Sequence, residues 1–405
     1  MRVPHSAACS LPFPGKNTVS STPSPTRIVR IDGYEIACQL PEVVGNSRRF
    51  FDTRSSLLVA ITTADGSTGW GETWAMPAAA AAIIRGPLGA QILGLDASAP
   101  RCVWQVMERT LGYDRRGISH MAFSALDMAV WDAAARSASL PLSALLGGAL
   151  RDRIPAYVSG PFLKTGADPY RDFDTDIDTY LNAGFRAIKM RMGVTPRTDG
   201  ALLRKVRERV GPTFPLMVDL NEGATLRSAL AYGEAFAESD LVWLEEPILH
   251  DNLDGYRRLA TELPMALAGG ESLFGLSAFR DYVAKGALDI VQPDLALCGG
   301  FSEALRIAAL ADAFDVPLIP HVWGTGINFC AAMQFTTILP ERRGPGITYP
   351  LFEYDYSANP LRDAFGAFPL ASDGTVTPPH GPGLGIEIDP RQFESLVVNR
   401  WTVVP

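Results

Sequence analysis

The chain contains 405 residues, and its composition is that of a folded globular protein. Apolar residues make up 47% and charged residues 20%, values that exclude a disordered or fibrous protein. The formal net charge of −8 lacks the basic excess of a nucleic-acid-binding protein. No apolar run reaches the roughly 18 residues of a membrane span, and the five cysteines are widely spaced without a CxxC pair. We therefore expect a cytoplasmic protein with no nucleic-acid or membrane partner.

The first part of the chain predicts a tail and then a small domain. Residues 1–26 are rich in proline, serine and threonine and predict a disordered tail. Residues 27–150 predict an α+β domain. Its expected elements are strands at 27–37 and 55–63, a loop from Pro41 to Asp52, a turn at Asp65-Gly66, a strand containing GWGE, and helices from Pro77, over 99–111 and over 118–138.

The second part alternates short apolar segments with helical ones. Eight strands are expected between residues 151 and 370, at 154–160, 185–191, 215–220, 241–245, 266–271, 289–294, 317–321 and 349–354. Strands separated by helices in this way predict a parallel (β/α) barrel. Residues 371–405 are strand-like again and are expected to return to the first domain.

Polar residues end five successive predicted barrel strands. They are Asp219, Glu245, Glu271, Asp294 and His321, separated by 26, 26, 23 and 27 residues. That spacing is about one βα unit in a barrel, and barrel active sites lie at the carboxyl ends of the strands. We therefore expect these five side chains to meet at one end of the barrel.

The first three of these residues predict a metal site. Asp219, Glu245 and Glu271 would repel one another in a buried barrel mouth, and a divalent cation with oxygen ligands, such as Mg²⁺, would remove that repulsion. The alternative is that each acid is a solvated strand end or a helix cap.

Four further residues predict acid–base chemistry on an anion. Lys189 and Arg191 are two residues apart in FRAIKMR and point to the same side of a strand. They would attract an anionic substrate, or they would form a structural salt bridge. Asp294 beside His321 would fix the imidazole tautomer and support a general base, although a lone histidine is often a core residue.

Other residues are weaker candidates for substrate contact. Asn221 would bind substrate or cap the next helix, and both readings stay open. Glu353 is preferred to Glu341 because its flanks are strand-like. The remaining candidates are Ser159, Tyr157, Arg48 and Trp323, of which Arg48 would suit a polar or diacid substrate and Trp323 would form an apolar wall.

Taken together, these motifs resemble the mandelate racemase subgroup of the enolase superfamily. The resemblance runs from about residue 27 to 390 and rests on GWGE, FRAIKMR, VDLN, WLEEP, GGE, PD, the histidine strand end and the late DG…PGLG. It implies a (β/α)7β barrel with an N-terminal capping domain completed by the C-terminal segment. It also implies one Mg²⁺ per subunit and a homo-oligomer, often an octamer.

The resemblance implies roles for individual residues. Asp219, Glu245 and Glu271 match the Mg²⁺ ligands, whereas Glu246 does not. Asp294 and His321 match the catalytic dyad, and Glu353 matches the acid that hydrogen-bonds the substrate carboxylate. Members of the family abstract the proton α to a carboxylate and form a metal-stabilised enediolate. A muconate-type member would carry a lysine where this chain has Leu297.

One position departs from the pattern and affects the predicted reaction. Arg191 stands where relatives often carry a lysine base, and a guanidinium is a poor base. Two-base racemisation is therefore disfavoured unless Lys189 substitutes, and an acid-sugar dehydratase is preferred. The alternatives are a racemase or epimerase of a 2-hydroxy acid or amino-acid derivative, and a non-catalytic barrel protein.

Overall fold

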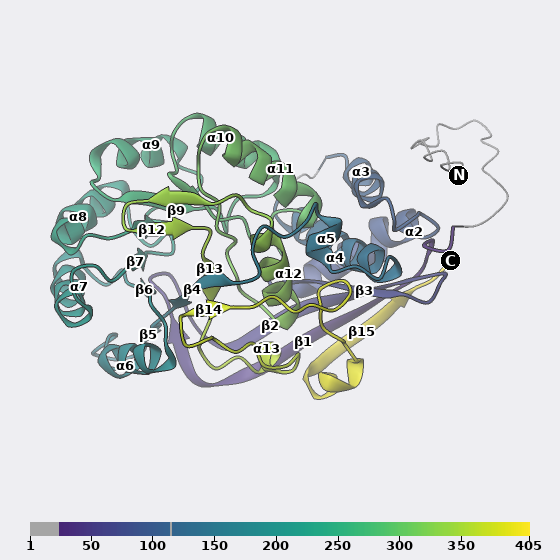
Figure 1. Cartoon of the computed structure of the whole chain (residues 1–405), viewed down its shortest axis with the longest axis horizontal. Coiled ribbons are helices and arrows are strands. Elements are labelled where there is room, and N and C mark those ends of the chain that lie inside the picture. The colour runs from purple at the N-terminus through teal and green to yellow at the C-terminus, as the bar shows by residue number, and fades with distance from the viewer. Residues whose placement is uncertain (1–23, 114–115) are drawn as a thin grey trace.

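A computed structural model describes residues 24–113 and 116–405 of the chain. The predicted tail, 1–26, lies outside the described residues except for 24–26. The chain forms a capping domain beside a barrel (Figure 1). Within the described ranges, no helix is long and apolar enough to cross a membrane.

An antiparallel sheet forms one layer of the cap. It contains β1 (Ile28–Gly45), β2 (Phe50–Thr63), β3 (Thr68–Thr73), β15 (Val397–Val403) and the short β5 (Leu163–Lys164). The strand order is β15-β1-β2-β3, with β5 also paired to β1. Figure 1 shows β15, from the C-terminal end, beside β1 from the N-terminal end. The C-terminal segment therefore completes the cap sheet.

The connection between the first two strands is shorter than the loop predicted from Pro41 to Asp52, so that prediction is wrong in its bounds. β1 continues to Gly45 and β2 begins at Phe50, which leaves a connection of residues 46–49. The β1–β2 register is interrupted between Gln39 and Val44. Pro41 lies in that interruption, where a residue without an N–H removes no ladder hydrogen bond. The proline therefore marks an irregularity within a long hairpin.

Helices cover one face of the cap sheet. They are α1 (Pro77–Ile83), η1 (Ile84–Leu88), α2 (Gly89–Ile92), α3 (Pro100–Thr110), α4 (Ile118–Ser137) and α5 (Leu142–Leu145). α4 is buried along most of its length and packs on β3. A Cβ at Gly71 would overlap the carbonyl oxygen of Ala125. Glycine in GWGE thus permits the close approach of strand and helix.

The barrel strands follow the predicted βα order. They are β4 (Ile154–Ser159), β6 (Ile188–Arg191), β7 (Leu216–Asp219), β8 (Trp243–Glu245), β9 (Ala266–Gly269), β10 (Ile290–Val291) and β13 (Phe352–Tyr354). They are parallel in the order β10-β9-β8-β7-β6-β4-β13. The predicted strand at 317–321 takes the remaining place and contacts its neighbour through two bridges, Val291↔Leu318 and Asp294↔His321. This is the (β/α)7β arrangement.

Helices alternate with these strands around the outside of the barrel (Figure 1). They are α6 (Phe173–Ala183), α7 (Pro196–Val210), α8 (Leu226–Phe236), η2 (Ala237–Ser239), α9 (Leu253–Glu262), α10 (Gly275–Ala284), α11 (Gly300–Ala313) and α12 (Gly326–Thr337). The smaller elements are β11 (Arg342–Gly344), β12 (Ile347–Tyr349), α13 (Pro360–Asp363), β14 (Thr375–Val376), η3 (Pro390–Gln392) and η4 (Glu394–Leu396).

Two buried acids of the cap bind the N-termini of barrel helices. Glu72 of β3 accepts hydrogen bonds from Thr325 and from the Asn328 N–H at the start of α12. Asp127 of α4 accepts from the N–H and hydroxyl of Ser302 at the start of α11. The carboxyl oxygens of these side chains satisfy free N–H groups of a helix N-terminus. These contacts attach the cap to the helices that follow the strand ends of Asp294 and His321.

The first prediction concerns the pH dependence of this attachment. Burial raises the pKa of Asp127 from 3.8 to about 8. The folded protein therefore holds this proton more tightly than the unfolded chain does. The free energy of unfolding should fall by up to about 1.4 kcal/mol per pH unit as pH rises between these two values. The asparagine side chain in Asp127→Asn cannot titrate. The free energy of unfolding of this variant should therefore fall less steeply with rising pH than that of the wild-type protein.

The measurement is denaturant unfolding at several pH values. Asp281→Asn, at a half-exposed aspartate of α10, is the matched control and should keep the wild-type pH dependence. An unchanged pH slope in Asp127→Asn would contradict the assignment.

Candidate active site

Three acids converge at the carboxyl ends of neighbouring barrel strands. Asp219 and Glu245 are the last residues of β7 and β8, and Glu271 lies two residues beyond β9. One carboxylate oxygen from each lies within 4.8 Å of the others. Asp219 and Glu245 are buried, and the Glu271 side chain is 19% exposed. The three acids therefore lie at the barrel end where the strand spacing predicts them.

Neighbouring polar groups hold two of these carboxylates in place. Glu245 Oε2 accepts hydrogen bonds from the indole of Trp243 and the amide of Gln292, both at 2.8 Å. Asn221 donates its backbone N–H to one oxygen of Asp219 at 2.7 Å and its side-chain amide to the other at 3.0 Å. Asn221 thus orients Asp219, and its own buried Oδ1 has no partner in the described part of the chain.

Lys189 supplies positive charge to the same cluster. Its ammonium contacts Glu245, lies 2.8 Å from Glu353 Oε1 and is 3.7 Å from Asp219 Oδ2. Burial alone would lower the pKa of Lys189, but the charges of Glu245 and Glu353 outweigh it and hold the pKa well above its ordinary value. Lys189 is therefore a protonated cation in this arrangement.

The cluster fits a divalent cation. Burial, and then the charge of Glu245, raise the pKa of Asp219 to about 7, so ionising these neighbouring acids together is unfavourable without further positive charge. The available donors are carboxylate oxygens, the ligands preferred by hard cations such as Mg²⁺. Asp219, Glu245 and Glu271 would hold that ion.

The Asp294–His321 pair forms as expected. His321 Nδ1 lies 2.8 Å from Asp294 Oδ2, and Nε2 lies 2.9 Å from Glu271 Oε2. Because the Asp294 carboxylate accepts a hydrogen bond, Nδ1 carries the proton and Nε2 faces the three acids. Burial opposes protonation of His321, but Glu271 and Glu353 raise its pKa well above the usual value, so the imidazole is protonated on both nitrogens while these acids are unneutralised. A cation held by Glu271 would offset that charge and favour the neutral imidazole that a base requires.

Arg191 is a buried cation whose charge is not locally paired. Its side chain donates to Ser159 Oγ at 3.0 Å. Among the described residues, no carboxylate lies within ion-pair distance of its guanidinium. Glu353, which lies nearby, forms an ion pair with Lys189 and accepts a hydrogen bond from the N–H of Val322. The charges of Asp219 and Glu353 act on this guanidinium from further away. Because it makes no direct ion pair with them, its N–H groups can still bind an anion.

An aromatic cluster lies beside these charges. The Trp323 ring packs within 6.3 Å, centroid to centroid, of Phe51, Phe162 and Trp74. The guanidinium of Arg54 lies 4.0 Å from the Trp323 ring and pairs with Asp355. Phe51 and Arg54 belong to the cap hairpin, so this wall is built from both domains.

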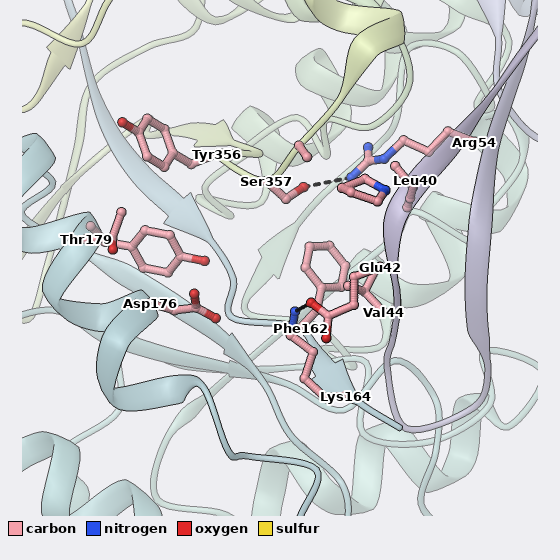
Figure 2. Close-up of a pocket in the computed structure, with 13 residues that line it drawn as sticks. Leu40, Glu42, Val44, Arg54, Phe162, Lys164, Asp176, Thr179, Tyr356 and Ser357 are labelled. Atoms are coloured by element: carbon pink, nitrogen blue, oxygen red, sulfur yellow. Dashed lines mark hydrogen bonds and ion pairs between the residues drawn. The ribbon is translucent and has the colours of Figure 1, made fainter. Parts of the chain in front are cut away.

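A pocket of about 270 Å³ lies on the outer side of that wall (Figure 2). In Figure 2, Arg54 bonds to Ser357 and Lys164 bonds to Glu42. Phe162 lines this pocket, and its ring also lies 4.2 Å from the Arg191 guanidinium. The three acids do not line it. The pocket therefore adjoins the acid cluster without containing it.

Several predicted substrate contacts have other partners in the structure. Arg48 pairs with Glu222, which also contacts His250. Tyr157 is fully buried and packs against Trp243 inside the barrel. Ser159 and Trp323 lie beside Arg191. Glu341 is exposed, in keeping with the preference for Glu353, which is buried.

Four residues that surround the site were not singled out from the sequence, although Phe51 and Trp74 lie in the segments 41–52 and 73–77 that the family resemblance places over the barrel mouth. Gln292 precedes Asp294 by two positions, and the alternation of side chains along a strand could have indicated it. Trp74 closely follows GWGE, but its bond to Asp294 joins residues 220 positions apart. Arg54 and Phe51 were likewise not predictable, because their contacts depend on how the cap docks.

Comparison with known proteins agrees with this geometry. Residues 172–392 match the family model "Enolase C-terminal domain-like", and residues 38–147 match "Mandelate racemase / muconate lactonizing enzyme, N-terminal domain". The chain belongs to the mandelate racemase/muconate lactonizing enzyme family of the enolase superfamily.

Curated relatives are enzymes of acid sugars. D-galactarolactone cycloisomerase of Agrobacterium fabrum is 38% identical over 84% of this chain and 90% of its own length. The 3,6-anhydro-alpha-L-galactonate cycloisomerase of Streptomyces coelicolor is 34% identical over 84% and 91%. Arabinonate dehydratase of Saccharolobus solfataricus is 32% identical over 82% and 88%.

Solved structures share the whole fold. A 3,6-anhydro-D-galactonate cycloisomerase from Zobellia galactanivorans superposes with a TM-score of 0.82 at 31% identity, covering 92% of this chain and 100% of its own. A racemase from Streptomyces coelicolor with bound magnesium gives a TM-score of 0.81 at 32% identity, with the same coverage.

The second prediction tests cation binding. Added Mg²⁺ should raise the melting temperature of the wild-type protein, by the equivalent of about 2.7 kcal/mol at a hundredfold excess over Kd. Glu271→Gln should abolish that rise, because it removes one of the three converging carboxylates. Glu246→Gln, which alters the adjacent strand-end acid, should retain it. Loss of the rise in Glu246→Gln alone would contradict the assignment.

Proposed function

We propose that the chain is a Mg²⁺-dependent acid-sugar dehydratase. The observation that carries the proposal is the position of His321. Its Nδ1 is held by Asp294, and its Nε2 faces three acids that fit a divalent cation. A base beside a cation suits removal of the proton α to a carboxylate, because that proton is only weakly acidic without charge neutralisation. The acid-sugar dehydratases and cycloisomerases among the relatives support this class of substrate.

The residues have distinct roles in this proposal. Asp219, Glu245 and Glu271 hold the Mg²⁺, which when bound neutralises charge developing on the substrate carboxylate. Arg191 binds the anionic substrate, since no local carboxylate pairs with it. Lys189 and Glu353 lie next to the same position, where the ammonium stabilises negative charge. Burial opposes ionisation of Glu353, but the Lys189 charge lowers its pKa, so this carboxylate accepts a hydrogen bond from a substrate hydroxyl.

The proton transfers need one base. His321 Nε2 takes the α-proton, and the C–H electron pair moves into the carboxylate as an enediolate. The enediolate then expels the β-hydroxyl, which leaves as water with the proton from His321. The resulting enol tautomerises to a 2-keto acid. Asp294 accepts the Nδ1–H hydrogen bond and stabilises the imidazolium between the two transfers.

The geometry gives little support to racemisation. A racemase needs a proton acceptor on each side of the α-carbon. Arg191 is permanently protonated, and the Lys189 ammonium is surrounded by three carboxylates. His321 is thus the only candidate base among the predicted catalytic residues.

A cycloisomerase is the second candidate function. The relatives at 38% and 34% identity are cycloisomerases. Elimination of a ring oxygen from the β-carbon begins with the same α-proton removal, so the residues above would serve either reaction. The two differ only in whether the leaving oxygen stays attached to the product.

We also propose one Mg²⁺ per subunit, from the carboxylate cluster, and a homo-oligomer, for which the family resemblance implies an octamer. The widely spaced cysteines support a proposed cytoplasmic location.

The direct experiment incubates the protein and Mg²⁺ with a panel of mono- and diacid sugars, their lactones and their anhydro forms. A dehydratase gives a 2-keto acid lighter than the substrate by one water, whereas a cycloisomerase gives a product of unchanged mass. Exchange of the α-hydrogen with deuterium, without elimination, would indicate a racemase. No turnover across the panel would contradict the acid-sugar assignment.

The third prediction isolates the base. His321→Asn should lower kcat by about 10²- to 10⁴-fold, the usual contribution of a positioned general base. His250→Asn is the matched control, since His250 contacts Glu222 outside the acid cluster, and it should retain activity. A His321→Asn enzyme that keeps most of its kcat would exclude His321 as the base.

A further inference from the structure

The Asp294 carboxylate is held from several directions. Oδ2 accepts hydrogen bonds from His321 Nδ1 and from the indole N–H of Trp74, both at 2.8 Å. Oδ1 accepts from the N–H of Ala296 at 2.7 Å and from the amide of Asn328 at 3.1 Å. A carboxylate can rotate about its terminal torsion. These donors on both oxygens fix one orientation.

Trp74 differs from the other donors because it belongs to the cap. It follows β3 directly, whereas Asp294, His321, Ala296 and Asn328 lie on the barrel. Its ring also packs 6.1 Å from the His321 ring, centroid to centroid. One side chain of the cap thus contacts both members of the proposed dyad.

Glu72 fixes the position from which Trp74 reaches Asp294. Its carboxylate is fully buried and accepts hydrogen bonds from the N–H groups of Thr325 and Asn328. A Cβ at Gly324 would overlap Glu72 Oε1, and Gly324 has φ +103°. The end of β3 is therefore held tightly against the start of α12, and Asn328 reaches Asp294 from that same helix.

We propose that Trp74 is a positioning residue that aligns the Asp294–His321 pair from the cap. The indole N–H holds Asp294 Oδ2 where it accepts from His321 Nδ1, and this directs Nε2 toward the three acids. When the cap packs onto the barrel, the same contact therefore orients the His321 base. The inference rests on the proposed function, because it treats His321 as the base.

The fourth prediction replaces Trp74 with phenylalanine. Trp74→Phe keeps an aromatic ring against His321 and Trp323 but removes the N–H donor. It should lower kcat by about 10- to 100-fold, the usual effect of removing a group that orients a catalytic residue. KM should be unchanged. The downfield proton resonance of His321 Nδ1–H, identified by its loss in His321→Asn, should move.

Trp131→Phe is the matched control. The Trp131 indole also donates a buried hydrogen bond, to Ser302 Oγ at 3.0 Å, on the side of the cap that contacts α11. This variant should leave kcat and the His321 resonance unchanged. If Trp74→Phe does not fold, 3-benzothienylalanine at position 74 makes the same test, because sulfur replaces the N–H while the bicyclic shape is kept.

Three results would overturn the inference. The first is equal behaviour of the Trp74 and Trp131 variants. The second is an increase in KM with kcat unchanged, which would make Trp74 a substrate contact. The third is a fall in kcat with no movement of the His321 resonance. Failure of the proposed function is recognised separately, because the substrate panel would then show no turnover or His321→Asn would retain activity. The His321 resonance in Trp74→Phe would still report whether Trp74 holds the Asp294–His321 pair.

Discussion

Charge balance among buried carboxylates is the constraint on which this site depends. Parallel strands bring Asp219, Glu245 and Glu271 to one end of the barrel, and an uncompensated group of acids there would be costly to ionise. Lys189 offsets part of the charge by contacting Glu245 and Glu353. The remaining negative charge is what a cation on Asp219, Glu245 and Glu271 would neutralise. Since Lys189 is engaged in this way, we assign the proposed proton transfer to His321.

Residues of the capping domain contact the candidate active site directly. Glu72 and Asp127 attach this domain to the helices that follow the strand ends of His321 and Asp294. Trp74 then reaches Asp294 directly, and Phe51 and Arg54 complete the wall around Trp323. We therefore propose that substrate selection, through the wall around Trp323, and base alignment, through Trp74, use neighbouring but separate contacts of the same domain interface.

The sequence predicted the features that follow from the repeated βα units of the barrel. The βα spacing placed Asp219, Glu245, Glu271, Asp294 and His321 at one end of the barrel, because parallel strands place their carboxyl ends together. It did not predict features that depend on docking, such as the bond between Trp74 and Asp294. Pro41 was read as part of a loop because a proline usually interrupts a strand, whereas here it lies in an irregularity of the hairpin. Arg48 was considered for substrate binding, but folding brings it to Glu222.

A crystal structure with Mg²⁺ and an unreactive acid-sugar analogue tests the account most directly. We predict the ion on oxygens of Asp219, Glu245 and Glu271, the analogue's carboxylate beside Arg191, and its α-carbon next to His321 Nε2. An ion bound elsewhere, or an analogue seated in the outer pocket lined by Arg54 and Lys164, would contradict it.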